Sequence, residues 1–191
     1  MLNIIMAVLL ASAGSAAAAG PTETVQVAVQ RVFSQQDGSA VKKVSTAERR
    51  ADIRKVAESL FDFQEMSRRS LGPAWDTVSP AEQDEFVRLF TSLIANAYMG
   101  KIEQYTGEPI TYEAEHVDGD EASVRSRVVT PKGSEVGIEY RLYRAPDRWA
   151  VYDINVDGVS LVGSYKAQFN RLLQRGSFAD LLKQLRQKAG S

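Results

Sequence analysis

The sequence predicts an α+β fold, with one sheet between two groups of helices. Over residues 109–157, apolar and polar side chains alternate with a period of two, which is typical of strands buried on one face. Turn-forming runs at residues 118–120, 131–133 and 145–147 divide this region into four strands. Short turns between consecutive strands favour a four-stranded antiparallel meander. The helices before and after it would cover its apolar face.

The chain divides into a leader and one domain. A length of 191 residues with 44% hydrophobic residues suits a single globular core. We expect a signal peptide at residues 1–19 and one domain at residues 20–191. Within it, residues 20–105 are mainly helical, residues 109–157 form the sheet, and residues 159–189 form the C-terminal helices.

The expected signal peptide rests on an apolar run and a cleavage pattern. The run from Leu2 to Leu10 is followed by small residues, and Ala17-Ala18-Ala19 fits the small-x-small cleavage rule. The run is shorter than the ~20 apolar residues that cross a bilayer. No positive charge precedes it, so either translation starts upstream or the α-amino group supplies the charge. With this signal and no Cys that could carry a lipid, we expect a protein that is free and soluble in the compartment outside the inner membrane, the periplasm.

The composition excludes several classes of function. Cys is absent, which excludes disulfides, thiolate metal sites, a thiol nucleophile and a lipidated N-terminal Cys. A net charge of −1 gives no reason to expect nucleic acid as a partner. His116 is the only histidine, so a zinc site would lack good ligands.

Capping patterns mark where helices begin. Ser79-Pro80-Ala81-Glu82 combines a Ser cap, a Pro at the first helical position and a Glu that reaches back. Ser45-Thr46-Ala47-Glu48 is a similar capping box. Ser160 is interpreted as a third N-cap, because an apolar helical face with Leu161 and Tyr165 follows it. This last helix comes directly after the final strand and is expected to pack back against the sheet.

The final predicted strand, Trp149–Val156, and the turn after it contain Asp153 and Gly158, each of which has two possible roles. Alternation places Trp149, Val151 and Asp153 on one face. The pair Asp157-Gly158 then ends the strand, and Gly158 is expected either as a plain turn glycine or as a hinge.

Acidic residues at the end of this strand suggest two kinds of chemistry. Asp153-x-Asn155-x-Asp157-Gly158 matches the first half of a calcium loop, but the twelfth position is Ser164 and not Glu, which favours a turn. Asp153 is either a general base in a pocket, as in small α+β isomerases, or a hydrogen-bonded residue at the strand end. The sequence leaves both interpretations of Asp153 open.

Three runs carry a resemblance to a known family. The first contains Phe61-Asp62-Phe63, Met66, Leu71-Gly72 and Trp75, the second contains Phe86, Phe90 and Tyr98, and the third contains Trp149, Tyr152-Asp153, Gly158-Val159-Ser160-Leu161, Tyr165 and Phe169. Together they resemble MlaC, the periplasmic phospholipid-binding component of the Mla lipid-transport system, also called the toluene-tolerance auxiliary family.

The resemblance implies a nuclear-transport-factor-like fold with a helical subdomain, in which the sheet curls around a deep apolar pocket. Phospholipid acyl chains would enter this pocket, and the head group would stay in water near its mouth. No cofactor and no covalent chemistry are implied. The implied partners are an inner-membrane MCE-domain protein of an ABC transporter and an outer-membrane lipoprotein–porin complex, with the protein itself a monomer.

Large apolar side chains on several elements would either fill an ordinary core or line this pocket. For the lipid-binding set we select Phe63, Met66, Phe90, Ile94, Tyr98, Ile138, Tyr140, Trp149, Val151, Leu161, Tyr165 and Phe169. The basic residues Lys101, Arg125, Arg127, Arg141 and Lys166 would either meet phosphate or a partner or remain ordinary surface charges. Two rival functions stay open: a pocket enzyme with Asp153 as its base, and a structural adaptor with a solid core.

Overall fold

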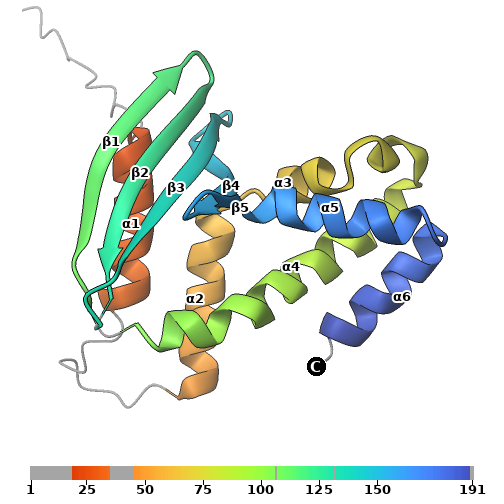
Figure 1. Cartoon of the computed structure of the whole chain (residues 1–191), viewed down its shortest axis with the longest axis horizontal. Coiled ribbons are helices and arrows are strands. Elements are labelled where there is room, and N and C mark those ends of the chain that lie inside the picture. The colour runs from red at the N-terminus through yellow and green to blue at the C-terminus, as the bar shows by residue number, and fades with distance from the viewer. Residues whose placement is uncertain (1–18, 35–44, 106, 131, 190–191) are drawn as a thin grey trace, which may run out of the picture.

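The structure, a computed structural model, describes residues 19–34, 45–105, 107–130 and 132–189, and it has two halves (Figure 1). The sheet half consists of a five-stranded sheet with α1 (Pro21–Ser34) and α2 (Thr46–Leu60). The helical half consists of α3 (Phe63–Leu71), the 3-10 helix η1 (Gly72–Thr77), α4 (Pro80–Glu103), α5 (Leu161–Leu173) and α6 (Phe178–Ala189). Apart from Ala19, the expected signal peptide lies outside the described residues.

The sheet is an antiparallel meander in which each strand pairs with the next one in the chain. Its strands are β1 (Ile110–Asp118), β2 (Glu121–Val129), β3 (Glu135–Arg144), β4 (Trp149–Val156) and β5 (Val159–Ser160), in this spatial order. The α+β fold and the meander are therefore confirmed. The short strand β5 extends the predicted four strands to five.

A two-residue turn connects β4 to β5. Val156 pairs with Val159, and the residues between them, Asp157 and Gly158, have φ angles of 48° and 86°. Two consecutive positive φ angles indicate a type I′ hairpin turn, whose twist matches that of the paired strands. Gly158 therefore has the role of a turn glycine, and a proline there would break the turn because proline fixes φ near about −65°.

The predicted capping signals lie at the observed helix starts. Ser45 and Ser79 each accept a hydrogen bond from the backbone N–H three residues on, and Glu48 and Glu82 reach back to them. Asp62 caps α3 by accepting from the Glu65 N–H at 2.9 Å. These bonds satisfy N–H groups that a helix start would otherwise leave unpaired.

The prediction for the faces of β4 is wrong beyond Val151. Val151 lies opposite Leu142, whereas Asp153 lies opposite Arg141, so Val151 and Asp153 are on opposite faces of the sheet. The extra residue is Tyr152, which forms a bulge. A bulge inserts one residue into one strand and thereby reverses the alternation that follows it.

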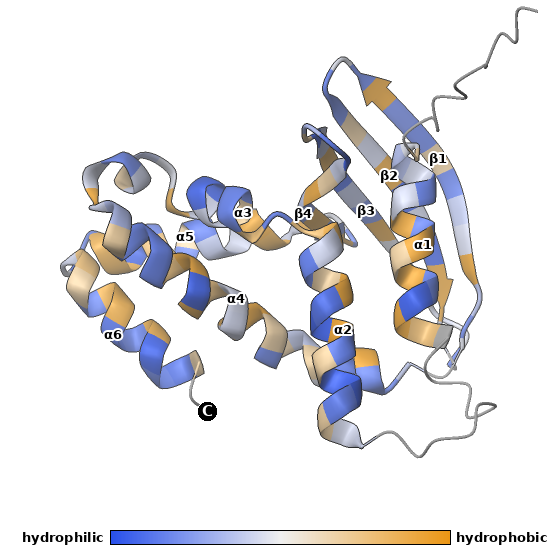
Figure 2. Ribbon diagram, turned by 180° about the vertical axis from the view of Figure 1, so that it is seen from behind, coloured by the Kyte–Doolittle hydropathy of each residue, from blue (hydrophilic) through white to orange (hydrophobic). Residues whose placement is uncertain are grey.

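Each half has its own apolar core. The core of the helical half is built from α3, η1, α4, α5 and α6, and its buried members include Met66, Phe86, Phe90 and Phe169. The core of the sheet half lies between the inner face of β2–β4 and the helices α1 and α2. Hydrophobic and hydrophilic bands alternate along α1, α4 and α6 (Figure 2), as expected for helices buried on one side.

Candidate functional site

The predicted lipid-binding residues fall into the two cores rather than into one. Eight belong to the helical half or pack against its core: Phe63, Met66, Phe90, Ile94, Tyr98, Leu161, Tyr165 and Phe169. The other four belong to the core of the sheet half or pack against it: Ile138, Tyr140, Trp149 and Val151. Phe61 packs against both cores, so the two sets meet where α2 leads into α3.

Aromatic rings pack against one another in the helical half. The centroid of the Phe90 ring lies 4.9 Å from that of Tyr165 and 5.4 Å from that of Phe169. Phe86 lies 5.4 Å from Phe169, again edge to face. These separations are those of favourable aromatic pairs. In this conformation the rings fill the space between α4 and α5, so an acyl chain would need the surrounding elements to move apart.

Both halves are attached to strand β4. The Asp62 N–H, at the start of α3, donates to the Val151 carbonyl at 2.9 Å. Phe61 forms an isolated bridge with Val151. At the start of α5, Asp153 accepts from the Val162 N–H at 2.9 Å. Helices α3 and α5 are therefore both fixed to β4 at their first residues.

The Asp153 carboxylate is buried, and each of its oxygens accepts a hydrogen bond. Its Oδ1 accepts from the Val162 N–H at 2.9 Å, and its Oδ2 accepts from the Ser160 hydroxyl at 2.6 Å. Arg141 Nη1 lies 3.8 Å from the same Oδ2. These contacts favour the interpretation of Asp153 as a hydrogen-bonded strand-end residue, because a general base needs a free lone pair directed at its substrate.

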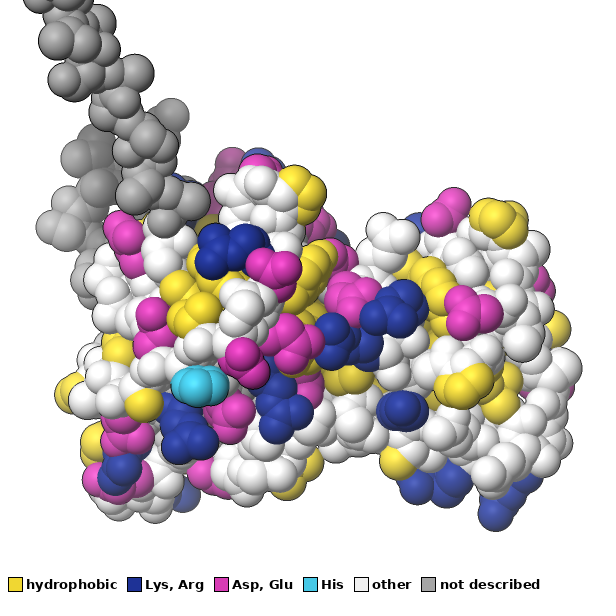
Figure 3. All heavy atoms as spheres, turned by 90° about the horizontal axis from the view of Figure 1, so that it is seen from above, with side chains coloured by type: hydrophobic (Ala, Val, Ile, Leu, Met, Phe, Trp, Pro, Cys, Tyr) yellow, Lys and Arg dark blue, Asp and Glu magenta, His cyan; other side chains and the backbone are white. Residues whose placement is uncertain are grey.

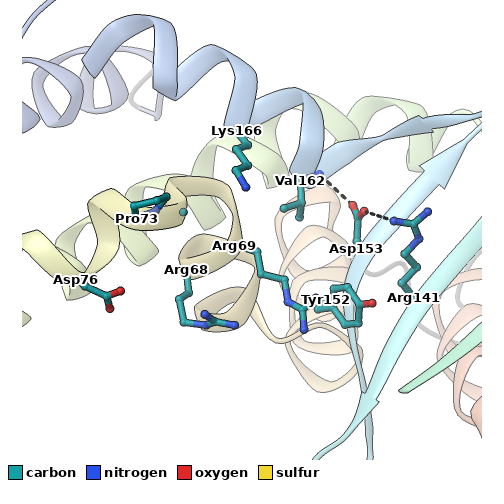
Figure 4. Close-up of a pocket in the computed structure, with 10 residues that line it drawn as sticks. Arg68, Arg69, Pro73, Asp76, Arg141, Tyr152, Asp153, Val162 and Lys166 are labelled. Atoms are coloured by element: carbon teal, nitrogen blue, oxygen red, sulfur yellow. Dashed lines mark hydrogen bonds and ion pairs between the residues drawn. The ribbon is translucent and has the colours of Figure 1, made fainter. Parts of the chain in front are cut away.

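A cavity of about 600 Å³ lies where the two halves meet, and we call it the junction cavity (Figure 4). Its lining comes from α3, η1, β3, β4 and α5. Ten residues line it: Arg68, Arg69, Gly72, Pro73, Asp76, Arg141, Tyr152, Asp153, Val162 and Lys166. Seen from above, Lys and Arg side chains lie at the surface between the halves, beside Asp and Glu side chains (Figure 3).

One carboxylate organises the two arginines of α3. Glu65 Oε1 lies 2.6 Å from Arg68 Nη2 and 2.7 Å from Arg69 Nε. The hydrogen bond from Arg68 is the main reason why the pKa of Glu65 is lowered. The Arg69 guanidinium also stacks 3.7 Å from the centre of the Tyr152 ring. Arg69 is thus held in place from two sides.

The cations that the sequence analysis named are spread over different sites. Arg141 and Lys166 line the junction cavity, and sequence reasoning missed Arg68 and Arg69, which join them. Arg127 is paired with Glu113 at 2.6 Å and also contacts Glu135. The other two lie apart: Lys101 is 5.2 Å from the Tyr98 ring centre, and Arg125 lines a second cavity of about 210 Å³ together with Ile138.

Neither a cluster of metal ligands nor a membrane-spanning helix is found among the described residues. Among them, no three His, Cys, Asp or Glu side chains gather as a metal site would require. Within the same residues, no helix combines the length and the apolar character needed to cross a bilayer.

Comparison with known proteins gives concordant results for sequence and structure. The sequence model of the MlaC protein family matches residues 26–187 of this chain. The intermembrane phospholipid transport system binding protein MlaC of Haemophilus influenzae is 21% identical over 195 aligned positions, which cover 99% of this chain and 91% of that protein.

A solved structure of the phospholipid-binding protein from Ralstonia solanacearum, in complex with a phospholipid, superposes with a TM-score of 0.76. The two chains are 25% identical, and the match covers 90% of this chain and 98% of the other. An NTF2-like structure from Campylobacter jejuni is 19% identical over 56% of this chain, with a TM-score of 0.32.

Proposed function

Because the chain belongs to the MlaC family, we propose that it is a phospholipid carrier that encloses acyl chains between its two apolar cores. The observation that carries the proposal is the match to the Ralstonia solanacearum structure, which contains a phospholipid and covers 90% of this chain. The twelve residues selected for lipid contact remain part of the proposal.

Enclosure is required by the cost of exposing acyl chains to water. A phospholipid has ~32 acyl methylenes, and exposing them to water would cost about 25 kcal/mol, at ~0.8 kcal/mol per methylene. A carrier must remove most of this surface from water, which needs a site of ~1,000 Å³, the upper end of common ligand pockets. The cavity where the two halves meet has a volume of about 600 Å³, so a site of the required size forms only when the halves separate.

The separation that we propose is a movement of the sheet relative to the helical half, with β4 as the axis. Helices α3 and α5 are both bonded to β4, so this strand stays attached to the helical half. The strands β1–β3 and the helix α1 lie beyond β4 in the sheet half. Two side-chain contacts join β3 and β2 to α3, from Tyr143 to Asp62 and from Glu121 to Arg69, and the movement would break them. Docking of a partner would move the sheet further from the helices than in the loaded protein, which would expose the acyl chains and so release the lipid.

The proposed setting is the periplasm, reached by means of the signal peptide at residues 1–19. The proposed partners are an inner-membrane MCE-domain protein of an ABC transporter and an outer-membrane lipoprotein–porin complex. The protein acts as a monomer, without a cofactor, without nucleic acid and without catalysis. The rival functions, an enzyme with Asp153 as base and a structural adaptor with a solid core, do not require a bound lipid.

Organic extraction of the purified protein, with native mass spectrometry of the same sample, tests the proposal. We expect about one diacyl phospholipid per protein and little preference among head groups, since a head group left in water gives little selectivity. Delipidated protein should regain lipid from vesicles. Absence of lipid both after purification and after incubation with vesicles would contradict the carrier function and leave the adaptor or the enzyme.

A further inference from the structure

The junction cavity gathers more positive than negative charge. Four cations line it, Arg68 and Arg69 from α3, Arg141 from β3 and Lys166 from α5, against the two carboxylates Asp76 and Asp153. Asp153 accepts hydrogen bonds from the start of α5, and the charge of Asp76 attracts that of Arg68. Arg69 is paired with Glu65, and Arg141 lies 3.5 Å from Glu139 and 3.8 Å from Asp153. Among the described residues, Lys166 is therefore the lining cation without an ion pair.

Lys166 is the least constrained of these cations. Within the described part of the chain it forms no ion pair and no hydrogen bond, and in Figure 4 its ammonium group points into the cavity. Its position is set by packing, because the side chain lies against Gly72: a methyl group added there would come within 3.2 Å of Lys166 Cε. The ammonium group thus has three donors available.

Arg69 and Arg141 also have donors to spare. Arg141 Nη1 is 3.8 Å from Asp153 and its Nε is 3.5 Å from Glu139, distances that permit charge attraction but not strong hydrogen bonds. Arg69 uses its Nε for Glu65 and places Nη2 3.6 Å from Glu121. The Arg69 guanidinium stacks on the Tyr152 ring, and this contact fixes the direction of its remaining N–H groups.

We propose that the junction cavity binds a phosphate group, with Lys166 as a point charge and Arg69 and Arg141 as directional donors. A tetrahedral anion with several acceptor oxygens suits donors that converge from three elements, and guanidinium groups bind phosphate oxygens in pairs. A volume of about 600 Å³ exceeds that of a phosphate group alone and leaves room for the atoms joined to it.

The position of the cavity makes a lipid the expected source of the phosphate. Val162 lines the cavity and is also a buried member of the core of the helical half. A phosphate held there would lie next to the apolar core, as a phospholipid requires where its head group meets its chains. The rest of the head group would stay in water, so the site would bind only the phosphate that different phospholipids share. This inference rests on the proposed function, and free inorganic phosphate is the other possible source of the same anion.

The test compares Lys166→Gln with Lys188→Gln, which removes the same charge from an exposed position on α6. The delipidated proteins are titrated with vesicles that contain phosphatidylglycerol, and separately with diacylglycerol of the same chain length. For Lys166→Gln we expect about tenfold weaker binding of the phospholipid, as for loss of a hydrogen bond to a charged group. Binding of diacylglycerol should not change, and Lys188→Gln should match the wild type for both lipids.

Inorganic phosphate, followed by phosphorus NMR, separates the two sources. Phosphate binding that depends on Lys166, together with an unchanged affinity for phospholipid, would show that the free anion is the ligand. An equal loss for phospholipid and diacylglycerol would overturn the site, because Lys166 would then act on packing. No effect of Lys166→Gln on phospholipid or on phosphate would also overturn it. If the wild type binds neither lipid, the carrier function fails, and the phosphate titration still decides the anion site.

Discussion

The two halves of the molecule bury their apolar side chains in different ways. In the helical half, rings from α4, α5 and α6 contact one another, and Phe86 lies 5.4 Å from Phe169 and 6.0 Å from Phe178. In the sheet half, a mostly aliphatic layer on β2–β4 is covered by two helices, and α2 buries only Ile53 and Leu60. The helical half is thus a self-contained core, whereas the sheet half depends on a peripheral cover.

This difference indicates which part moves when a ligand enters. Interlocked rings resist separation, because each ring would lose contacts that no other group replaces. A sheet covered by a lightly buried helix can be displaced at lower cost. We therefore expect the helical half to stay rigid and the sheet half to move as a unit about β4.

The largest expected effect is that of Phe90→Ala, in the helical half. Phe90 is fully buried and contacts Phe86, Tyr165 and Phe169, so its removal should lower the free energy of unfolding by about 3–5 kcal/mol. Leu60→Ala, in the cover of the sheet half, should cost about 2–3 kcal/mol, because the exposed neighbours on α2 can close the gap. Urea unfolding of the delipidated proteins measures both values. A larger loss for Leu60→Ala than for Phe90→Ala would contradict the proposed difference between the two halves.

The next largest effect is expected at Asp153, which joins strand β4 to helix α5. Asp153→Ala leaves the Val162 N–H and the Ser160 hydroxyl without their acceptor, so we expect a loss of about 2–4 kcal/mol in the free energy of unfolding. Asp153→Asn keeps an acceptor for the N–H and should lose less than half as much. Ser160→Ala removes the N-cap and the hydrogen bond from the Ser160 hydroxyl to Asp153, and should cost about 1–2 kcal/mol. Equal losses for Ala and Asn would show that the acceptor at this position is unimportant.

A smaller effect is expected at Gly72, where η1 begins. Its φ of 58° lies in the left-handed region, and a Cβ would press on the end of Lys166. Gly72→Ala should therefore destabilise the protein by about 1–3 kcal/mol through backbone strain. Phospholipid binding should weaken as well if Lys166 contacts the phosphate. Thermal unfolding and vesicle titration measure the two effects, and an unchanged stability would contradict the strain.

The smallest effect is a pH dependence at Tyr143, which links β3 to the start of α3. The Tyr143 hydroxyl donates to the Asp62 carboxylate, and this bond raises the pKa of Tyr143 to about 12. A raised pKa in the folded state means that the stabilisation is present below the ordinary tyrosine pKa of about 10 and is lost as the pH rises towards 12. Tyr143→Phe should therefore flatten the decline in stability between pH 10 and about 12. Urea unfolding across this range checks it, and parallel curves for the two proteins would exclude the link.

Much of the fold follows from local patterns. The capping boxes at Ser45 and Ser79 and the period of two over residues 109–157 are local signals, because the interactions behind them span only a few residues. The bulge at Tyr152 was missed, since a count of alternating residues cannot detect one inserted residue. That omission assigned Asp153 to the wrong face.

The candidate site was less accessible to sequence reasoning. The period of a helix or strand tells which of its faces is apolar, but not which other element packs against that face. The twelve selected residues were therefore expected around one pocket, whereas they lie in two cores. The junction cavity depends on α3, β3 and α5 meeting in space. The pair Arg68-Arg69, three and four residues after Glu65, was a local signal for an organised cation pair that could have been recognised.

The central claim is that lipid enters when the sheet half moves away from the helical half. Since the chain has no Cys, spin labels can be attached at His116→Cys on β1 and Lys188→Cys on α6, and their separation measured by pulsed electron paramagnetic resonance. A second pair, Asp84→Cys with Lys188→Cys, lies within the helical half and serves as the control. We predict a longer distance for the first pair in the phospholipid-loaded protein than in the delipidated protein, and an unchanged distance for the control. The same distance for the first pair in both states, with lipid bound, would contradict the account.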